Sequence, residues 1–199
     1  MKVLAFSDLH GDMDKAKELA ERAEKENVDL VLMCGDIARN DEEQNGLVGI
    51  FKNKRVLLVS GNHDWNSAEF WAELYNFKNL HGDSSKYYDI GFFGCGLANI
   101  GVSSLSENDF FYTLKAGFDK ISSAKQKVMI THNHPANTKS ENFSKIIQGS
   151  KGIRKAIDEF QPDIAICGHI HEAEGFEEKI GKTRLINVGR KGFVFEMKP

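Results

Sequence analysis

The sequence predicts an α/β fold. Five short apolar runs end in turns rich in Gly, Asp or His, and segments with helical spacing lie between several of them. The runs do not alternate apolar and polar residues, which is typical of strands that are covered on both faces, as in sheets packed between layers. The five predicted strands are residues 3–6, 30–34, 56–59, 128–131 and 164–167.

Four segments have the apolar spacing of amphipathic helices. Residues 13–26 place alanine and leucine on one face among lysines and glutamates, with Asp12 as a candidate cap and Asn27 as a candidate end. Ser106 and Asp109 have the spacing of a capping box in front of a second helix. The remaining two helices are predicted at residues 67–75 and 152–160.

The second half of the chain predicts further strands with antiparallel pairing. Residues 87–95 and 184–197 have a β-type composition interrupted by glycine. Residues 189–192 predict a hairpin turn that joins the strands on either side of it. Residues 134–150 are polar and show no clear period, which predicts a long loop and a candidate lid or substrate-facing segment.

Length and composition predict one globular domain over residues 1–199. Of these residues 41% are hydrophobic and 28% charged, enough to bury a sizeable core, and no repeat or linker divides them. The net charge of −3 gives no general attraction to nucleic acid or to an anionic membrane. No targeting segment is visible, and no stretch approaches the roughly 18 apolar residues that a membrane span needs. We therefore expect neither a membrane nor a nucleic acid as partner.

The cysteines predict a reducing environment. Cys34, Cys95 and Cys167 are widely separated and odd in number, which suits buried thiols better than a disulfide framework. Cys34 and Cys167 each precede a glycine of the segments described next, and we interpret them as small residues that pack strand ends. A cytoplasmic location follows as an expectation.

Each of the five apolar runs is followed directly by side chains that can bind a metal. Six of the seven histidines fall in these segments, which are residues 8–10, 35–36, 61–64, 132–134 and 168–171. Because the carboxyl ends of parallel strands form one edge of a sheet, the segments can converge on one cleft. Aspartate, histidine and asparagine suit divalent Mn, Fe, Zn, Co or Ni, and the set is too large for a single ion.

Single residues of these segments also have structural interpretations. Asp8 could cap a helix, and Asp36 or Asn62 could be a turn residue. His134 could contact substrate, pack or cap, and the sequence does not choose among these roles. The aromatic group that follows the third segment could line a pocket there, although the core face of the next helix is the preferred interpretation; this group is Trp65, Phe70 and Trp71.

The five segments, taken in order, resemble the motifs of calcineurin-like metallophosphoesterases. That family's signature runs Asp-x-His, Gly-Asp, Gly-Asn-His-Asp or Glu, an isolated His and Gly-His-x-His, and this chain has all five from Asp8 to His171. The resemblance implies a four-layer α/β/β/α sandwich, with two mixed β-sheets flanked by helices. It also implies a phosphoesterase with two divalent metal ions, in which a metal-bridging hydroxide attacks phosphorus.

The resemblance further implies a metal ligand set. Asp36 would bridge both ions through its carboxylate. The ligands of the first ion would be Asp8, His10 and His171. Those of the second would be Asn62, His132 and His169.

The resemblance and the residue chemistry together predict two catalytic residues. His63 would contact phosphate or protonate the leaving oxygen. Asp64 would hydrogen-bond the imidazole of His63 and fix its orientation, as a carboxylate supports a catalytic histidine.

Two functions fit this pattern, a metal-dependent phosphohydrolase and a non-catalytic protein-binding module on the same fold. The complete ligand set favours the hydrolase. Arg39 stands one position earlier than the phosphate-binding arginine of protein phosphatases in the motif Gly-Asp-x-Val-Asp-Arg-Gly, although it could still reach the substrate, and the short, mildly acidic chain leaves little room for a nuclease. We therefore expect a small-molecule or nucleotide phosphate ester as substrate, with mono- and diesters both open.

Overall fold

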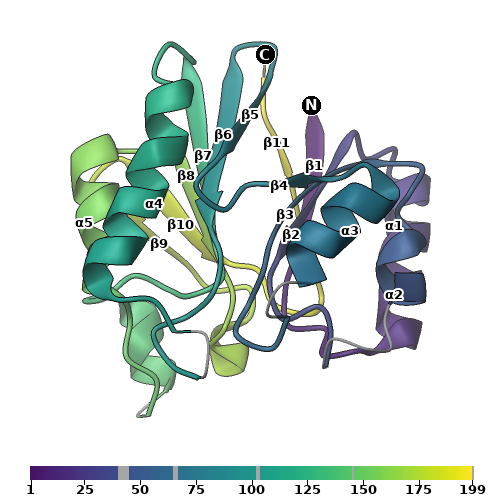
Figure 1. Cartoon of the computed structure of the whole chain (residues 1–199), viewed down its shortest axis with the longest axis horizontal. Helices are drawn as coiled ribbons and strands as arrows, with labels where there is room; N and C mark the ends of the chain where they lie inside the picture. Colours follow the sequence, from purple (N-terminus) through teal and green to yellow (C-terminus); the bar gives the residue numbers. More distant parts are fainter. Residues whose placement is uncertain (40–44, 65–66, 102–103, 145, 199) are drawn as a thin grey trace.

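Two mixed β-sheets face each other, and helices cover the outer face of each sheet (Figure 1). The computed structural model of the protein describes residues 1–39, 45–64, 67–101, 104–144 and 146–198. Its four layers run helix, sheet, sheet, helix. The α/β/β/α architecture implied by the family resemblance is therefore confirmed.

The first sheet has five strands, and most of them are parallel. Strand β11 is the exception, since it pairs antiparallel with β1 at one edge. The order is β11 (Phe193–Glu196), β1 (Lys2–Phe6), β2 (Leu30–Cys34), β3 (Arg55–Val59) and β4 (Lys78–Asn79). The helices beside this sheet are α1 (Met13–Lys25), α2 (Asn45–Gly49) and α3 (Ser67–Tyr75).

The second sheet has six strands, with a parallel centre and an antiparallel strand at each edge. The order is β5 (Ser84–Tyr87), β6 (Ile90–Cys95), β7 (Gln126–Thr131), β8 (Ile164–Cys167), β10 (Thr183–Asn187) and β9 (Glu177–Ile180). Its outer face is covered by α4 (Glu107–Lys120) and α5 (Lys151–Phe160). Two short 3-10 turns are η1 (Lys139–Phe143) and η2 (His171–Ala173).

Burial on both faces explains why the strands are continuous apolar runs. Along β1, Val3 and Ala5 belong to the core between the two sheets. The intervening Leu4 and Phe6 belong to the core that the first sheet forms with α1, α2 and α3. Since successive side chains of a strand point to opposite faces, a strand between two layers needs an apolar residue at every position. All five predicted strands are confirmed for this reason.

The predicted helix caps are confirmed as well. The Asp12 carboxylate accepts the Lys15 N–H at the start of α1, with a distance of 3.0 Å, and Asn27 just beyond its end has a positive φ of 52°. Ser106 and Asp109 form a capping box at the start of α4. These local hydrogen bonds are readable from sequence because both partners lie within one turn of the helix.

Helix α3 has its predicted bounds but a smaller buried face. Trp71 lies in the core, whereas Phe70 and Leu74 are 50% and 51% exposed. The interpretation of Phe70 as part of a core face is therefore wrong. Trp65 lies outside the described residues.

The predicted hairpin around residues 189–192 is wrong. The strands on either side of it lie in different sheets, because β10 pairs with β8 and β9 while β11 pairs with β1. The turn is bound by residues distant in sequence: the Gly189 carbonyl accepts the Ser7 N–H at 3.0 Å, and the Glu174 carboxylate accepts the Arg190 N–H at 2.7 Å. The segment thus carries the chain across from one sheet to the other. The expected antiparallel pairing late in the chain is confirmed at β9 and β11.

The cysteines and the lengths of the helices can also be compared with the predictions. Cys34, Cys95 and Cys167 are buried and unpaired, as predicted. Among the described helices, none combines the length and apolar character that crossing a bilayer requires.

Phe92→Ala tests the core between the sheets. The Phe92 side chain is fully buried there, so its loss should lower the free energy of unfolding by about 3–5 kcal/mol. Leu74→Ala on the exposed side of α3 is the control. This substitution should change the free energy of unfolding by about 0.5 kcal/mol or less. Urea denaturation measures both, and similar losses in the two variants would contradict this description of the core.

Candidate metal centre

The five predicted segments meet at one edge of the molecule, just beyond the carboxyl ends of β1, β2, β3, β7 and β8. Side chains from four of these segments line a cleft of about 340 Å³, which includes His10, Asp36, Asn62, His63 and His169. Asp8 and His132 are buried behind it. The predicted convergence of residues far apart in sequence is therefore confirmed.

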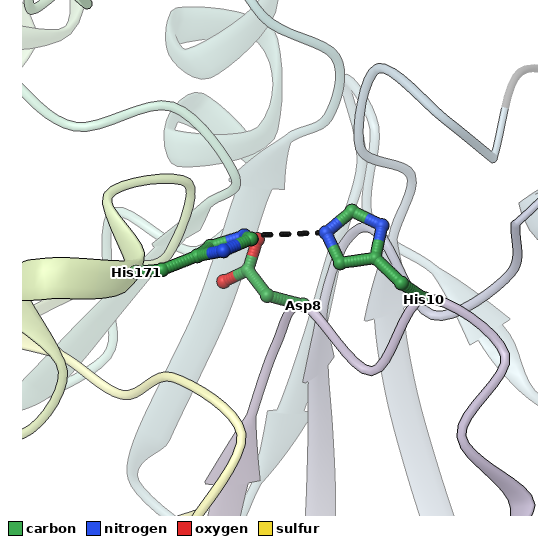
Figure 2. Close-up of side chains that lie close together, drawn as sticks. All are labelled: Asp8, His10 and His171. Atoms are coloured by element: carbon green, nitrogen blue, oxygen red, sulfur yellow. Dashed lines mark hydrogen bonds and ion pairs between the residues drawn. The ribbon is translucent and has the colours of Figure 1, made fainter.

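Asp8, His10 and His171 form the first group of candidate ligands (Figure 2). The Nε2 atoms of His10 and His171 lie 3.2 Å apart, and Asp8 Oδ1 lies 3.5 Å from His171 Nε2. One ligand atom from each residue lies within 4.8 Å of the other two. The three residues can therefore hold one ion.

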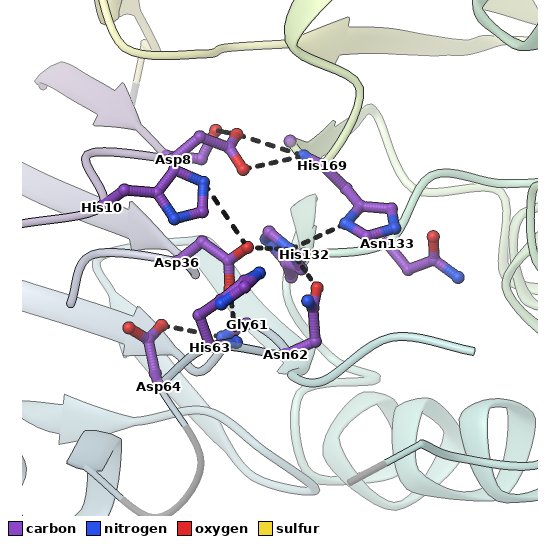
Figure 3. Close-up of polar contacts among 12 residues, drawn as sticks. Asp8, His10, Asp36, Gly61, Asn62, His63, Asp64, His132, Asn133 and His169 are labelled. Atoms are coloured by element: carbon purple, nitrogen blue, oxygen red, sulfur yellow. Dashed lines mark hydrogen bonds and ion pairs between the residues drawn. The ribbon is translucent and has the colours of Figure 1, made fainter. Parts of the chain in front are cut away.

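Asp36, His132 and His169 form a second group of the same kind, in which all three residues are buried (Figure 3). His132 Nε2 lies 3.3 Å from Asp36 Oδ2 and 3.1 Å from His169 Nδ1. The Asn62 side-chain oxygen lies 3.2 Å from the same His132 nitrogen, so Asn62 is positioned to join this group.

Asp36, a member of the second group, also faces the first, and it forms a third candidate group with His10 and His63. Its Oδ1 accepts the backbone N–H of His63 at 2.8 Å. Its Oδ2 lies 3.8 Å from His10 Nε2 and 3.3 Å from His132 Nε2. One carboxylate oxygen thus faces both candidate ligand groups, while the other anchors the carboxylate to the next loop.

The backbone is strained where the ligands are attached. Asp8, His10, Asp36 and His169 have positive φ angles between 46° and 70°. For a non-glycine residue this conformation costs about 1 kcal/mol or more. Hydrogen bonds between neighbouring loops compensate for this strain: the Asp8 and His10 N–H groups donate to the carbonyls of Gly35 and Asp36 at 3.0 and 2.9 Å.

Two motif glycines are required by close approach. A Cβ at Gly61 would lie 2.0 Å from Asp36 Oδ1, and one at Gly168 would lie 2.3 Å from Ser7 Oγ. No side chain fits at either distance. The glycines therefore let neighbouring strand ends approach closely enough to bring the ligands together.

The charges of the site favour a cation. Burial opposes the charged form of Asp36, yet His132 and the His63 N–H hold its pKa below the usual range. Burial also opposes the charged form of His132, but the Asp36 and Asp8 carboxylates outweigh it and raise its pKa to about 9. Burial and the neighbouring His132 lower the pKa of His169 to about 3. Although burial opposes it, the contact with His171 also lowers the pKa of Asp8, so both carboxylates remain ionised. His169 stays neutral, whereas the carboxylates hold His132 in its charged form, a position that a bound cation would take over.

The donor set fits divalent metal ions. The Nδ1 of His132 lies 3.0 Å from the Cys34 carbonyl, a contact that orients the ring and leaves Nε2 toward the site. His169 turns its Nδ1 toward His132 Nε2, so Nδ1 is the ring atom positioned as a ligand of this group. Oxygen and imidazole donors in this combination suit the predicted divalent ions. They do not form a structural zinc site, which would need cysteine thiolates.

The contacts of the Asp64 carboxylate differ from those predicted. Both oxygens of this fully buried carboxylate accept backbone N–H groups, from Ala38 and from Gly61, each at 2.8 Å. No hydrogen bond to the His63 ring occurs among the described residues, so the predicted support of that imidazole is wrong. Burial and the nearby Asp36 raise the pKa of Asp64 to about 6, against the effect of the two hydrogen bonds. Asp64 instead ties the loop after β2 to the loop after β3.

His63 and His134 occupy opposite sides of the site. His63 is exposed over the cleft, with its ring edge-on to His10 at a centroid distance of 5.0 Å, where a substrate can reach it. His134 is fully buried behind His169, and neither of its ring nitrogens has a partner among the described residues. The suggested substrate contact of His134 is therefore not supported. Arg39 is exposed and is not one of the residues that line the cleft.

Four lining residues were not singled out from the sequence, and one of them, Gly101, directly follows Ile100. Ile147 lies on the segment predicted to face substrate, and it lines the cleft. Ile100 follows strand β6 in a loop with no recognisable motif, and no signal could have found it. Glu172 directly follows a predicted ligand, and that position was its only signal.

Comparisons with known proteins point to the same family. A profile of the calcineurin-like phosphoesterase superfamily domain matches residues 1–199. The uncharacterized protein MJ1162 of Methanocaldococcus jannaschii is 32% identical over 212 residues, covering 100% of this chain and 93% of that protein. The protein TT1561 of Thermus thermophilus has a similar structure, with a TM-score of 0.71, 15% identity, and coverage of 96% of this chain and 90% of that one. A dimetal phosphatase from Danio rerio is similar at a TM-score of 0.61, with 15% identity and coverage of 96% and 88%.

The profile match and the ordered motifs describe the same residues. The solved structures share the fold, the profile spans the entire chain, and the motif residues meet in one metal-competent cleft. The chain belongs to the calcineurin-like phosphoesterase superfamily.

Proposed function

We propose that this protein hydrolyses a small-molecule or nucleotide phosphate ester with two divalent metal ions. The observation that carries the proposal is the position of Asp36 Oδ2, which faces both candidate ligand groups. A carboxylate shared in this way can hold two cations close together despite their repulsion. The similar structure of a dimetal phosphatase supports the same arrangement.

The proposal assigns Asp8, His10 and His171 to one ion, and a second set of residues to the other. That second set is Asn62, His132 and His169. Bound there, the ions would supply Lewis-acid polarisation of the ester and a water nucleophile of lowered pKa. Mn, Fe, Zn, Co and Ni all suit these donors.

Residues of the chain would position the ester and donate a proton to it. His63 is exposed beside His10, so its imidazole can donate a proton to the leaving oxygen or a hydrogen bond to phosphate. Asp64 keeps the loop that carries Asn62 and His63 in place through its two backbone hydrogen bonds. The cleft of about 340 Å³ suits a small substrate.

Two further parts of the proposal rest on the sequence. We infer that residues 1–199 form a single domain, which the family profile over the same residues supports. The buried, unpaired cysteines support a cytoplasmic location, where thiols stay reduced.

Asp36→Asn tests the shared carboxylate. The wild-type protein with added Mn²⁺ should hydrolyse a generic aryl phosphate or phosphodiester and should bind two metal ions by elemental analysis. The amide has one oxygen and no charge, so the variant should lose both ions together and nearly all activity. Two tightly bound ions with normal activity in Asp36→Asn would refute the bridge.

The wild-type protein also tests the second candidate function. If it binds metal but hydrolyses no tested ester with any divalent ion, a non-catalytic protein-binding module becomes the better interpretation.

His63→Ala tests the proton donor. Metal content should stay unchanged because His63 is not assigned to either ion, while turnover of esters with poor leaving groups should fall about 100-fold. Esters with acidic leaving groups need no proton, so their hydrolysis should be much less affected. Steady-state kinetics on a pair of aryl esters measures the difference, and an equal loss on both would count against an acid role.

Asp64→Asn tests the structural role of this carboxylate. The amide would place an NH₂ group against a backbone N–H donor, which should lower the free energy of unfolding by about 1–3 kcal/mol. Asp119→Asn, at an exposed position on α4, is the matched control and should have an effect of about 0.5 kcal/mol or less. If Asp64→Asn instead leaves stability intact and reproduces the leaving-group dependence of His63→Ala, Asp64 supports the imidazole after all.

A further inference from the structure

Part of the cleft that contains the candidate ligands is lined by apolar residues. Ile100, Gly101 and Ile147 line the same cavity as Asn62 and His63. Ile100 and Ile147 also line an adjoining hollow of about 200 Å³, together with Asn99, Ile146 and Gln148. The space beside the candidate ligands is therefore flanked by an extension that three isoleucines and two amide side chains line.

The loop that carries Ile100 is attached to the ligand loop. The Leu97 N–H donates to the Ser60 carbonyl at 2.8 Å, two residues before Asn62. A Cβ at Gly101 would lie 3.7 Å from the Asn62 Cβ, which is ordinary contact. The loop that carries Ile100 is thus fixed relative to the ligands.

Hydrogen bonds hold the loop that carries Ile147. The Ile147 N–H donates to Ser144 Oγ at 3.1 Å, and the Gly149 N–H donates to Glu141 Oε1 at 2.8 Å. The Asn99 amide, next to Ile100 in sequence, donates to the Gln148 carbonyl at 3.0 Å. This last hydrogen bond ties the two loops to each other.

Large apolar side chains are left in water here. Ile100 is 49% exposed and Ile146 is 86% exposed. Covering such surface is favourable by roughly 25 cal/mol per Å². An apolar group placed in the extension would therefore add to the binding free energy of a molecule held at the candidate metal ligands.

The charges around the cleft restrict the ligand further. Among the described residues that line the cleft and its extension, none is Lys or Arg, and Glu172 lines the cleft beside His171. An anionic group beyond the reacting phosphate would find no Lys or Arg among these residues, and Glu172 adds a negative charge to the cleft. Nucleoside polyphosphates and carboxylated esters are disfavoured by this arrangement.

We infer that the substrate is a phosphate ester whose leaving group is apolar and uncharged, of about the size of an aromatic ring system, and that this group binds between Ile100 and Ile147. The inference rests on the proposed function, because it takes the phosphate to lie at the candidate ligands. Water is the co-reactant, and the products are the apolar alcohol or phenol and the phosphate.

Binding of phosphonates tests this inference separately from hydrolysis, because their C–P bond is not cleaved by ester hydrolysis. With the Mn²⁺-loaded protein, calorimetry should show 2-naphthylmethylphosphonate binding on the order of tenfold or more tightly than methylphosphonate. The double variant Ile100→Ser/Ile147→Ser should lose most of this preference. Leu74→Ser, an exposed position on α3, is the control and should keep it.

A charged probe tests the role of Glu172. A naphthylmethylphosphonate with a carboxylate on its distal ring should bind several-fold more weakly than the uncharged compound, and Glu172→Gln should narrow that gap. Equal affinity for methyl- and naphthylmethylphosphonate, or a naphthyl preference that survives in the double serine variant, would overturn the inference. Retention of the naphthyl preference by a protein that hydrolyses neither naphthyl nor methyl phosphate would instead overturn the proposed function and leave the apolar site standing.

Discussion

The contact between Asp36 and His132 is the interaction on which the site depends. Asp36 follows β2 of the first sheet and His132 follows β7 of the second, and their side chains meet at 3.3 Å in a buried position. A buried carboxylate is stable only with partners, and this one has His132 on one oxygen and the His63 N–H on the other. The pair therefore joins the two sheets at the edge where the strand ends meet.

Packing between the sheets makes this contact possible. The core between them consists of alternate residues of strands from both sheets, so their separation is set by close-packed side chains rather than by loops. Ligands attached directly beyond the strand ends inherit that rigidity. Backbone strain at four ligands and the glycines that admit close contacts are tolerated because this surrounding structure holds them in place. Geometry suited to a cation is thus present in the protein itself.

Local signals explain which features could be predicted from sequence. Strands buried on both faces appear as continuous apolar runs, and caps involve residues within one turn, so both were predicted correctly. The partner of β11 could not be predicted, because a glycine-rich turn before a strand looks the same whether the strand folds back or crosses to another sheet. The hydrogen bonds of Asp64 were missed for a similar reason. Its side-chain direction depends on backbone amides of another loop, which the order of residues does not show.

The candidate ligands and the apolar residues of the cleft lie on different kinds of segment. The residues proposed for catalysis are therefore distinct from those proposed to select the substrate. The candidate ligands follow strand ends in both sheets, so moving one of them would disturb the packing of a sheet. Ile100 and Ile147 lie on loops that are joined to each other through Asn99 and Gln148. A substitution at either isoleucine changes the apolar surface without touching a ligand, whereas a change in Asn99 would release one loop from the other. Under the proposed function, substrate preference can therefore vary while the candidate ligands keep their positions.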